Sequence, residues 1–194
     1  MKLQIICVAY ERVIPLRILI DCLLVQSSPN WELHLIYDGP VPKEVKEVVD
    51  DRPDPRIHFE NTPTRTGDWG HHNRAMMLQK IECEPTDFVL LTNDDNMYVP
   101  MFVELFLNKC DEKAGLVFCN TIHSYINYGI LHTQVRENFI DMGSFAVRAD
   151  VAKKIGFNRR HLSADGHYAE ECANYCRENK LLLRYVPQYV FVHN

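Results

Sequence analysis

The first half of the chain alternates short apolar runs with amphipathic segments, and this alternation most constrains how the chain can fold. Four runs of strand length are rich in apolar residues: 3–10 (LQIICVAY), 31–38 (WELHLIYD), 56–62 (RIHFENT) and 87–94 (DFVLLTND). The segments between them, 14–29, 41–53 and 71–81, carry apolar residues at helical spacing. Strands that alternate with helices predict a mostly parallel sheet with helices on both faces, which is an α/β fold.

The second half is less regular. We expect helices over 99–110 and 163–179, a strand over 115–125 and a closing strand over 181–194. Residues 128–157 mix strand and helix signals and are left undivided. The chain has no repeat, low-complexity tract or linker. We therefore predict a single α/β domain over residues 1–194.

Composition and charge exclude several classes of protein. A net charge of -5, with no run of Lys or Arg, argues against nucleic acid as a partner. No stretch approaches the ~18 apolar residues of a membrane span, and the first residues read as a strand rather than a signal peptide, so any membrane contact would be peripheral. The 7 cysteines are odd in number and lie mostly in apolar segments, which favours reduced thiols in a cytoplasmic protein.

Three aspartates stand at the ends of predicted strands. Asp38 ends the second strand, and Asp94 and Asp95 end the fourth. Ligands of open α/β sheets bind at the carboxyl ends of the strands, so these carboxylates should converge on one crevice. Carboxylates so close repel one another, and a divalent cation such as Mg²⁺ or Mn²⁺ would neutralise them.

Adjacent residues on an extended chain point to opposite sides. We therefore expect Asp94 and Asp95 to divide their roles, with one on the metal and the other on a ligand hydroxyl. The alternative is that "NDDN" forms a turn whose side chains cap the helix that follows Pro100.

Four segments, in their order and spacing, carry a resemblance to a known family: "CVAYER", "DCLLVQSSPNWELHLIYDGP", "HHNRAMML" and "NDDNMYVP". With them, nearly the whole chain resembles a family 2 glycosyltransferase of the GT-A fold. The Asp-Asp-Asn-x-Tyr-x-Pro form is similar to the branch that contains spore-coat polysaccharide glycosyltransferases. The resemblance implies a nucleotide-binding half over residues 1–100 and an acceptor-side half over 101–194.

The resemblance also implies roles for the residues at the strand ends. Asp38 would accept a hydrogen bond from N3–H of a uracil ring. Asp94 would hold the ribose or the sugar, and Asp95 would bind Mn²⁺ or Mg²⁺ on the diphosphate. Tyr10 would line the nucleoside pocket beside Ala9, which stands where the family often has Thr.

Further nucleotide and sugar contacts follow from the same resemblance. Arg65, Asn73 and Arg74 would lie near the nucleotide, although Arg74 fits equally well as an ordinary surface charge of a helix. Gly143 and Ser144, in "DMGSFAVRAD", would contact the donor or acceptor. A plain turn glycine is the alternative for Gly143.

The catalytic base and the last metal ligand are expected late in the chain. The resemblance points to an acidic residue at the start of a late helix, where Asp165, Glu170 and Glu171 are the candidates. We favour Asp165, because Ser163 is suited to cap the helix and places Asp165 in its first turn. His193, at the end of the closing strand, is the candidate metal ligand, although a lone histidine more often has another role.

The function that the resemblance implies is inverting, metal-dependent transfer of a sugar, most simply from a UDP-sugar, to a hydroxyl of a glycan or other acceptor. The alternative is a degenerate domain that binds a nucleotide-sugar or serves as a subunit without turnover. Tyr37, which replaces a family Asp, keeps this alternative open. A nucleotidyltransferase or a dinucleotide-dependent oxidoreductase would need glycine-rich loops that the chain lacks. The sequence does not determine whether the chain forms a homo-oligomer.

Overall fold

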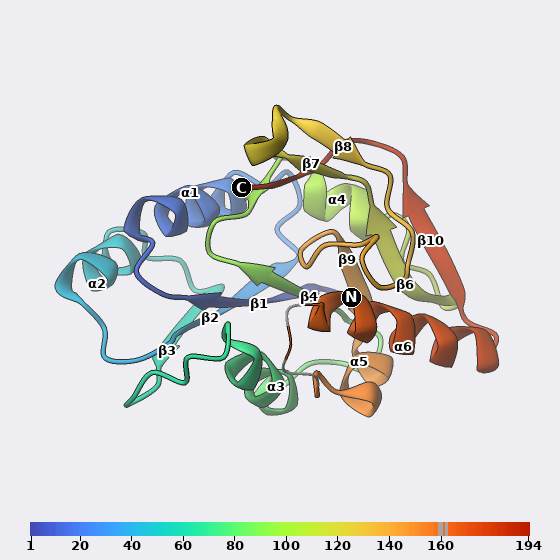
Figure 1. The fold of residues 1–194 in the computed structure, drawn as a ribbon, viewed down its shortest axis with the longest axis horizontal. Coiled ribbons are helices and arrows are strands. Elements are labelled where there is room, and N and C mark those ends of the chain that lie inside the picture. The colour runs from blue at the N-terminus through green and yellow to red at the C-terminus, as the bar shows by residue number, and fades with distance from the viewer. Residues whose placement is uncertain (159–160, 162) are drawn as a thin grey trace.

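A large mixed sheet forms the centre of the computed structural model, which describes residues 1–158, 161 and 163–194 (Figure 1). The sheet has the strand order β10-β6-β9-β4-β1-β2-β3, and only β9 runs against its neighbours. The strands are β1 (Leu3–Ala9), β2 (Trp31–Tyr37), β3 (Ile57–Asn61), β4 (Phe88–Asn93), β6 (Ala114–Cys119), β9 (Phe145–Arg148) and β10 (Leu182–Val186). This confirms the predicted α/β fold.

Helices cover both faces of the sheet, as the alternation predicted. Helices α1 (Val13–Leu24), α2 (Lys43–Asp50) and α4 (Phe102–Leu107) lie on one face, and α3 (His71–Lys80), α5 (Ala149–Ile155) and α6 (Ala164–Glu178) lie on the other (Figure 1). Among the described residues, every helix is too short or too polar to cross a membrane.

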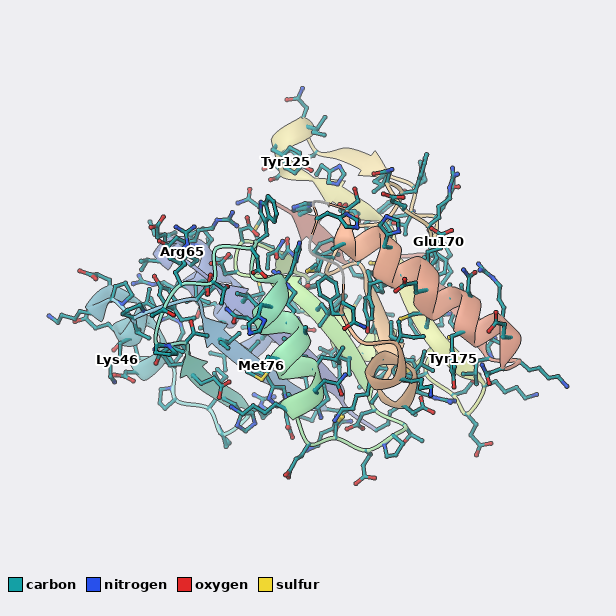
Figure 2. The ribbon with its side chains drawn as sticks, turned by 60° about the horizontal axis from the view of Figure 1, so that its bottom comes forward. Lys46, Arg65, Met76, Tyr125, Glu170 and Tyr175 are labelled. Atoms are coloured by element: carbon teal, nitrogen blue, oxygen red, sulfur yellow. The ribbon has the colours of Figure 1, made fainter. Side chains whose placement is uncertain are left out.

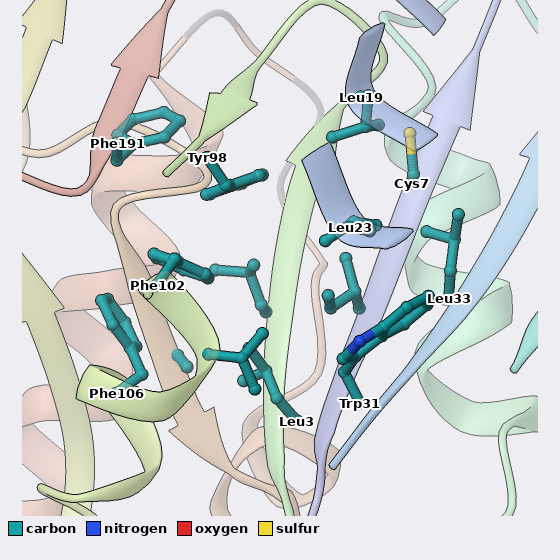
Figure 3. Close-up of a cluster of buried hydrophobic side chains, with 14 of the residues drawn as sticks. Leu3, Cys7, Leu19, Leu23, Trp31, Leu33, Tyr98, Phe102, Phe106 and Phe191 are labelled. Carbon is teal, nitrogen blue, oxygen red and sulfur yellow. The ribbon is translucent and has the colours of Figure 1, made fainter. Parts of the chain in front are cut away.

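The core is divided into two layers by the sheet itself. Successive side chains of a strand point to opposite faces, so Leu3, Ile5 and Cys7 of β1 pack under α1, while Ile6 and Val8 pack toward α3. The side chains on both faces of β1 are almost fully buried, which explains why its sequence is a continuous apolar run rather than an alternating one. Figure 3 shows part of the first layer.

A second, smaller sheet lies at the upper edge of Figure 1 and was not predicted. It has the order β5-β11-β7-β8, from β5 (Met97–Tyr98), β11 (Phe191–His193), β7 (Thr121–His123) and β8 (Gly129–Leu131). The expected strand over 115–125 is therefore two strands in different sheets, and so is the expected closing strand over 181–194.

The two breaks have different physical causes. β6 ends at Cys119, and the side chain of the next residue, Asn120, donates to Tyr185 Oη (2.8 Å) and accepts from the Thr133 amide (3.1 Å). β10 ends immediately before Pro187, which has no amide hydrogen for a sheet ladder. Both breaks direct the chain from the large sheet into the small one.

One glycine brings α3 close to the end of β1. Gly70 precedes the first residue of α3 with φ +75°, a conformation that favours glycine. A Cβ at this position would lie 2.6 Å from Val8 Cγ1, so any side chain would push the helix away from the strand. Glycine therefore sets how closely the start of α3 approaches the carboxyl end of β1.

The aromatic contacts of α4 generate a stability prediction. Phe102 is fully buried, with ring centroids 4.3 Å from both Tyr98 and Phe106 (Figure 3). We expect Phe102→Ala to lower the free energy of unfolding by about 3–5 kcal/mol, because the removed ring leaves a cavity. Urea denaturation followed by circular dichroism measures the change. Ile14→Ala, at a position 69% exposed, is the control and should change the free energy by less than about 0.5 kcal/mol.

Candidate active site

A pocket of about 550 Å³ opens at the carboxyl ends of β1, β2 and β4. β1 lies between β2 and β4 in the sheet. From β2 the chain continues toward one edge of the sheet, and from β4 it continues toward the other edge. α/β sheets bind ligands at such a change of direction. The lining residues are Val8, Ala9, Tyr10, Glu11, Arg12, Asp38, Arg65, Gly67, Trp69, Gly70, Arg74, Asn93, Asp94, Asp95, His193 and Asn194. The predicted convergence of Asp38, Asp94 and Asp95 is confirmed.

Asp38 is buried and organises the loop that precedes α3. Its Oδ1 accepts hydrogen bonds of 2.9 Å from the Thr66 amide, the Thr66 hydroxyl and the Asn73 side chain, while Oδ2 accepts a long one (3.4 Å) from the Gly67 amide. Burial alone would raise the pKa of Asp38, but these donors outweigh it and lower the pKa below its usual value. The carboxylate is therefore ionised, and Oδ2 keeps the capacity to accept from a ligand.

The charge of the Asp94–Asp95 pair is partly offset by Arg12, which follows β1. Arg12 Nη1 forms an ion pair with Asp95 Oδ2 and lies 3.3 Å from Asp94 Oδ1. Asp94 Oδ2 also accepts from the Tyr10 amide at 3.0 Å. Burial raises the pKa of Asp94 to about 6, against the lowering effects of the Tyr10 amide and Arg12. A buried strand can thus be followed by two acids because Arg12, in the segment that follows the neighbouring strand, meets both.

The expectation that Asp94 and Asp95 point to opposite sides is wrong. β4 ends at Asn93, and the two aspartates form a turn instead of continuing the strand. The turn is fixed by Asn96, which is fully buried and donates from Nδ2 to Thr92 Oγ1 (3.0 Å). In a turn the alternation of an extended chain is lost, so both carboxylates reach the same guanidinium.

The alternative capping role of "NDDN" does not match the structure. The residue that caps α4 is Met101, and no side chain forms a capping hydrogen bond there. The two carboxylates are instead directed to Arg12 and into the pocket.

Tyr10 forms an aromatic wall of the pocket. The guanidinium of Arg65 lies 3.8 Å above the centre of the Tyr10 ring, and the Tyr37 ring lies 6.0 Å away. Tyr37 is buried, and its hydroxyl accepts from the Glu11 amide at 3.3 Å. Tyr37 thus supports the loop after β1. Ala9 also lines the pocket, and its carbonyl accepts from the Asp38 amide (2.9 Å).

Asn73 and Arg74, at the start of α3, fix the positions of other residues of the site. Asn73 is fully buried and donates to Asp38, so it positions that carboxylate. Arg74 is only 3% exposed, which rules out an ordinary surface charge. Its guanidinium lines the pocket and donates to the Trp69 carbonyl (2.6 Å) and to Asn93 Oδ1. Arg74 therefore ties the loop before α3 to the end of β4.

The three candidates for the base have different surroundings. Asp165 is half-buried in the first turn of α6 and accepts from the Met142 amide at 3.1 Å. Burial raises its pKa, and the nearby Asp141 raises it further. Glu170 accepts from the Glu137 amide (3.4 Å), and Glu171 lines a separate surface pocket. Figure 2 shows Glu170 on α6, away from Arg65.

Asp165 does not itself line the main pocket, but it interacts electrostatically with His193 and Arg74, which do. Ser163 is the N-cap residue of α6, as expected, although its hydroxyl forms no capping hydrogen bond. The charge of Asp165 thus acts on two residues of the pocket.

Gly143 and Ser144 lie outside the pocket lining. Gly143 has φ +93°, and a Cβ there would lie 2.8 Å from the side chains of Asn96 and Tyr98, so tight packing explains the glycine. Ser144 is fully buried and donates to the Asp141 carbonyl (2.6 Å). Their contacts with a donor or acceptor stay predictions.

With this geometry established, comparison with known proteins identifies the family. The model of "Glycosyl transferase family 2" matches residues 4–172, which is most of the chain. The chain belongs to glycosyltransferase family 2. No curated protein matches it.

Several solved structures share the fold of this chain. S. aureus TarS 1–349 has a TM-score of 0.79 and 16% identity, and the match covers 100% of this chain and 60% of that one. The same protein in complex with UDP-GlcNAc has a TM-score of 0.79 at 15% identity, with 58% of its chain covered. The mannosyltransferase PcManGT from Pyrobaculum calidifontis, in complex with GDP-Man and Mn²⁺, has a TM-score of 0.73 and 16% identity, with 99% of this chain and 56% of that one covered. The family 2 chain described here thus spans about 60% or less of these neighbours.

Several residues of this family 2 site were missed in the sequence. Arg12 stands only two residues after Tyr10 in "CVAYER", so a cation beside a predicted strand end was the available signal. Trp69 lines the pocket with φ +56°, which no sequence pattern indicates. His123 and Asp141 lie beside His193 and also carry no local signal.

The Arg12 ion pairs generate a pH prediction. The pKa of Asp94 lies above its usual value, so the protonated carboxyl is favoured by folding, and this stability is lost as the pH rises through about 6. Arg12→Gln removes a group that lowers this pKa. We expect the variant to titrate Asp94 at a higher pH, and to lose about 1 kcal/mol of stability at pH 8 but little at pH 4.

Carboxyl NMR titration and denaturation at the two pH values measure these changes. Arg17→Gln, an exposed position on α1, is the matched control. An unchanged Asp94 titration in Arg12→Gln would show that Arg12 does not act on this carboxyl.

Proposed function

We propose that this chain transfers a sugar from a nucleotide-diphosphate sugar to an acceptor hydroxyl, with inversion at the anomeric carbon. The observation that carries the proposal is the acidic turn Asp94–Asp95 at the mouth of the pocket, in a chain of glycosyltransferase family 2. Its charge is partly offset by Arg12, whose side chain is 51% exposed. Such a site suits a ligand that arrives together with a cation.

The residues present fit a divalent cation, Mn²⁺ or Mg²⁺, on Asp95. Asp95 Oδ1 is buried and has no hydrogen-bond partner among the described residues, so an oxygen ligand stands ready. Hard cations take one or two protein carboxylates and complete their shell with phosphate oxygens and water. When bound, the ion would neutralise charge on the departing nucleoside diphosphate. Binding of Mn²⁺ by PcManGT supports this assignment.

The nucleoside is proposed to lie against Tyr10 and Asp38. The Tyr10 ring is suited to stack a base, which would replace the Arg65 guanidinium that lies 3.8 Å from the ring centre or would lie on the face that Arg65 does not cover. Asp38 Oδ2, with its one long hydrogen bond, is the acceptor for a base N–H such as N3–H of uracil. A UDP-sugar is the first donor to test, because UDP and UDP-GlcNAc are bound by TarS, and GDP-mannose is the second, because PcManGT binds it.

Asp165 is proposed as the general base. Its burial and the neighbouring Asp141 raise its pKa toward the range in which a carboxylate accepts a proton well. The acceptor oxygen would lose its proton to Asp165 as it attacks the anomeric carbon from the side opposite the diphosphate. That single displacement gives inversion, and Asp94 and Arg74 would hold the donor in place. Similarity to the spore-coat branch, a cytoplasmic location and the identity of the acceptor stay predictions.

The metal-binding role of Asp95 is tested by Asp95→Asn. We expect the parent chain to bind UDP more tightly with Mn²⁺ and to hydrolyse UDP-GlcNAc slowly. In the variant, Mn²⁺ should no longer strengthen UDP binding, and the rate at which UDP is released from UDP-GlcNAc should fall by at least ~100-fold. Thermal shift measures the binding, since only ligands of the folded state raise the melting temperature.

Asp50→Asn, an exposed aspartate on α2, is the matched control for this variant. A UDP affinity of the parent chain that does not change with Mn²⁺ would contradict the metal role. Binding without any turnover, over a panel of UDP- and GDP-sugars, would favour the alternative of a nucleotide-sugar binding domain.

The base is tested by Asp165→Asn. We expect UDP affinity to stay within about twofold and the transfer or hydrolysis rate to fall by at least ~100-fold, because a general base acts on the acceptor and not on the nucleotide. Glu178→Gln, at the exposed last residue of α6, is the control. Unchanged turnover in Asp165→Asn would remove it from this role, and Glu170 would then be tested first.

A further inference from the structure

A second pocket, of about 400 Å³, lies between the edge of the large sheet and α3, and it shares no lining residue with the candidate active site. Strands β2 and β3 contribute one wall, and the end of α3 with the residues after it contributes the other (Figure 1). The lining residues are Glu32, His34, His58, Phe59, Glu60, Met77, Lys80, Ile81 and Glu82. The pocket therefore combines two histidines with several acidic side chains on paired strands.

The two histidines occupy paired positions of adjacent strands. His34 of β2 and His58 of β3 are partners in the parallel register, and their rings stack with centroids 5.0 Å apart and 19° between their planes. Residues two apart on a strand share a face, so Glu32 lies on the same face as His34. Glu32 Oε2 lies 3.7 Å from His58 Nε2. The backbone pairing thus gathers two imidazoles and a carboxylate in one place.

A chain of buried side chains fixes the position of the proton on His34. The carboxylate of Asp87 accepts from the Lys2 amide (2.7 Å) and from Gln4 Nε2 (3.2 Å). Because the Gln4 nitrogen faces Asp87, its Oε1 faces His34 Nε2, at 2.8 Å. A carbonyl oxygen only accepts, so Nε2 carries the hydrogen of the neutral ring and Nδ1 keeps its lone pair. Gln4 and Asp87 are 2% and 4% exposed, so water competes little for these bonds.

The lone pair of His34 Nδ1 is available to a ligand. Within the described part of the chain, the hydrogen bond of His34 is the one at Nε2, and none reaches Nδ1. Burial, with the charge of His58, lowers the pKa of His34 to about 4, so the ring is neutral near pH 7. Histidines that bind metals usually donate their other ring N–H to a carbonyl or a carboxylate, which directs the lone pair at the ion. Gln4 and Asp87 hold His34 in this way.

We propose that His34, His58 and Glu32 bind Zn²⁺, with water in the fourth position. Imidazole and carboxylate ligands suit this ion, and its bond lengths of ~2.0–2.2 Å place two tetrahedral ligands about 3.3 Å apart. The 3.7 Å between His58 Nε2 and Glu32 Oε2 is close to this spacing. Ligand atoms of all three residues do not yet lie within 4.8 Å of one another, so binding turns His58, whose side chain is 52% exposed, toward His34.

The charge around this zinc site favours a cation. Glu32 and Glu60 oppose the effect of burial on the pKa of His34, so the negative charge of both reaches this ring. Each carboxylate is paired with a lysine, Lys2 for Glu32 and Lys80 for Glu60, and the lysine side chains are 51% and 57% exposed. Ion pairs so exposed contribute little to stability, so Zn²⁺ can replace Lys2 on Glu32.

A bound ion would link the edge strand to the rest of the large sheet. β3 is the last strand of this sheet, and its partner is β2. Zn²⁺ held by side chains of both strands should therefore stabilise this edge. The site needs no nucleotide, so it can be tested independently of the proposed function.

The proposal is tested by titrating Zn²⁺ into the full chain without nucleotide and following the histidine ring ¹⁵N resonances by NMR. Before Zn²⁺ is added, His34 should have the spectrum of the Nε2–H form. Zn²⁺ should then shift His34 Nδ1 and a ring nitrogen of His58, while the exposed His132 stays unchanged. The melting temperature should also rise with Zn²⁺, since the ion binds the folded chain.

Variants separate this site from other groups of the chain that could bind Zn²⁺. We expect His34→Gln and His58→Gln to weaken Zn²⁺ binding by at least ~100-fold, and Gln4→Leu by about 10- to 100-fold, because Gln4 orients a ligand. His132→Gln, the matched control, and Asp95→Asn should bind Zn²⁺ as the parent does. His58→Gln changes an exposed side chain, so this variant decides the test if His34→Gln fails to fold by circular dichroism.

Two results would overturn the proposal. One is an equal Zn²⁺ affinity of the parent and His58→Gln, measured by competition with a zinc-binding dye. The other is a Zn²⁺ titration that shifts the resonances of His123 and His193 but leaves those of His34 unchanged, because the ion would then bind at the small sheet instead.

Discussion

The gathering of negative charge at one edge of the sheet is the constraint on which the site depends. Parallel pairing of β1 with β2 and β4 brings their carboxyl ends together, and two of these ends carry aspartates. Water cannot screen carboxylates that are nearly buried, so each needs a partner. Asp38 obtains neutral donors from the loop before α3, whereas Asp94 and Asp95 obtain the cation of Arg12. The two kinds of partner differ, because the amide donors to Asp38 are part of the fold, whereas a ligand or a cation can replace the exposed Arg12 side chain.

The features that were predictable depend on local pattern and on one rule of sheet geometry. Buried strands are short, apolar runs and amphipathic helices have a periodicity of 3.6 residues, and these two patterns located the first four strands and the helices between them. The rule that parallel strands present their carboxyl ends at one edge then brought Asp38, Asp94 and Asp95 together before any coordinate was known. Tyr10, which comes directly after β1, was assigned to the pocket by the resemblance to the family.

The features that were not predictable arise from contacts between distant residues. Arg12 meets Asp95 across 83 positions of sequence, and His123 meets Asp141 and His193 only because β7 and β11 pair. The break after Cys119 was missed because residues 115–125 were interpreted as one continuous strand. The direction of the Asp94 and Asp95 side chains was mispredicted for a related reason: a turn held by the buried Asn96 amide replaces the extended backbone that alternation assumes.

The single residue Asn120 joins β6 of the large sheet to β7 of the small one, and its amide is bonded on both sides. Because this connection is one residue long and hydrogen-bonded on both sides, we expect it to keep the large sheet and the small sheet in a fixed relative orientation. Any accommodation of substrates of different size must then come from the segments that border the pocket rather than from one sheet rocking against the other. Variation among relatives of this chain in the range of substrates they accept should accordingly be concentrated in the loop that carries Arg65 and Trp69.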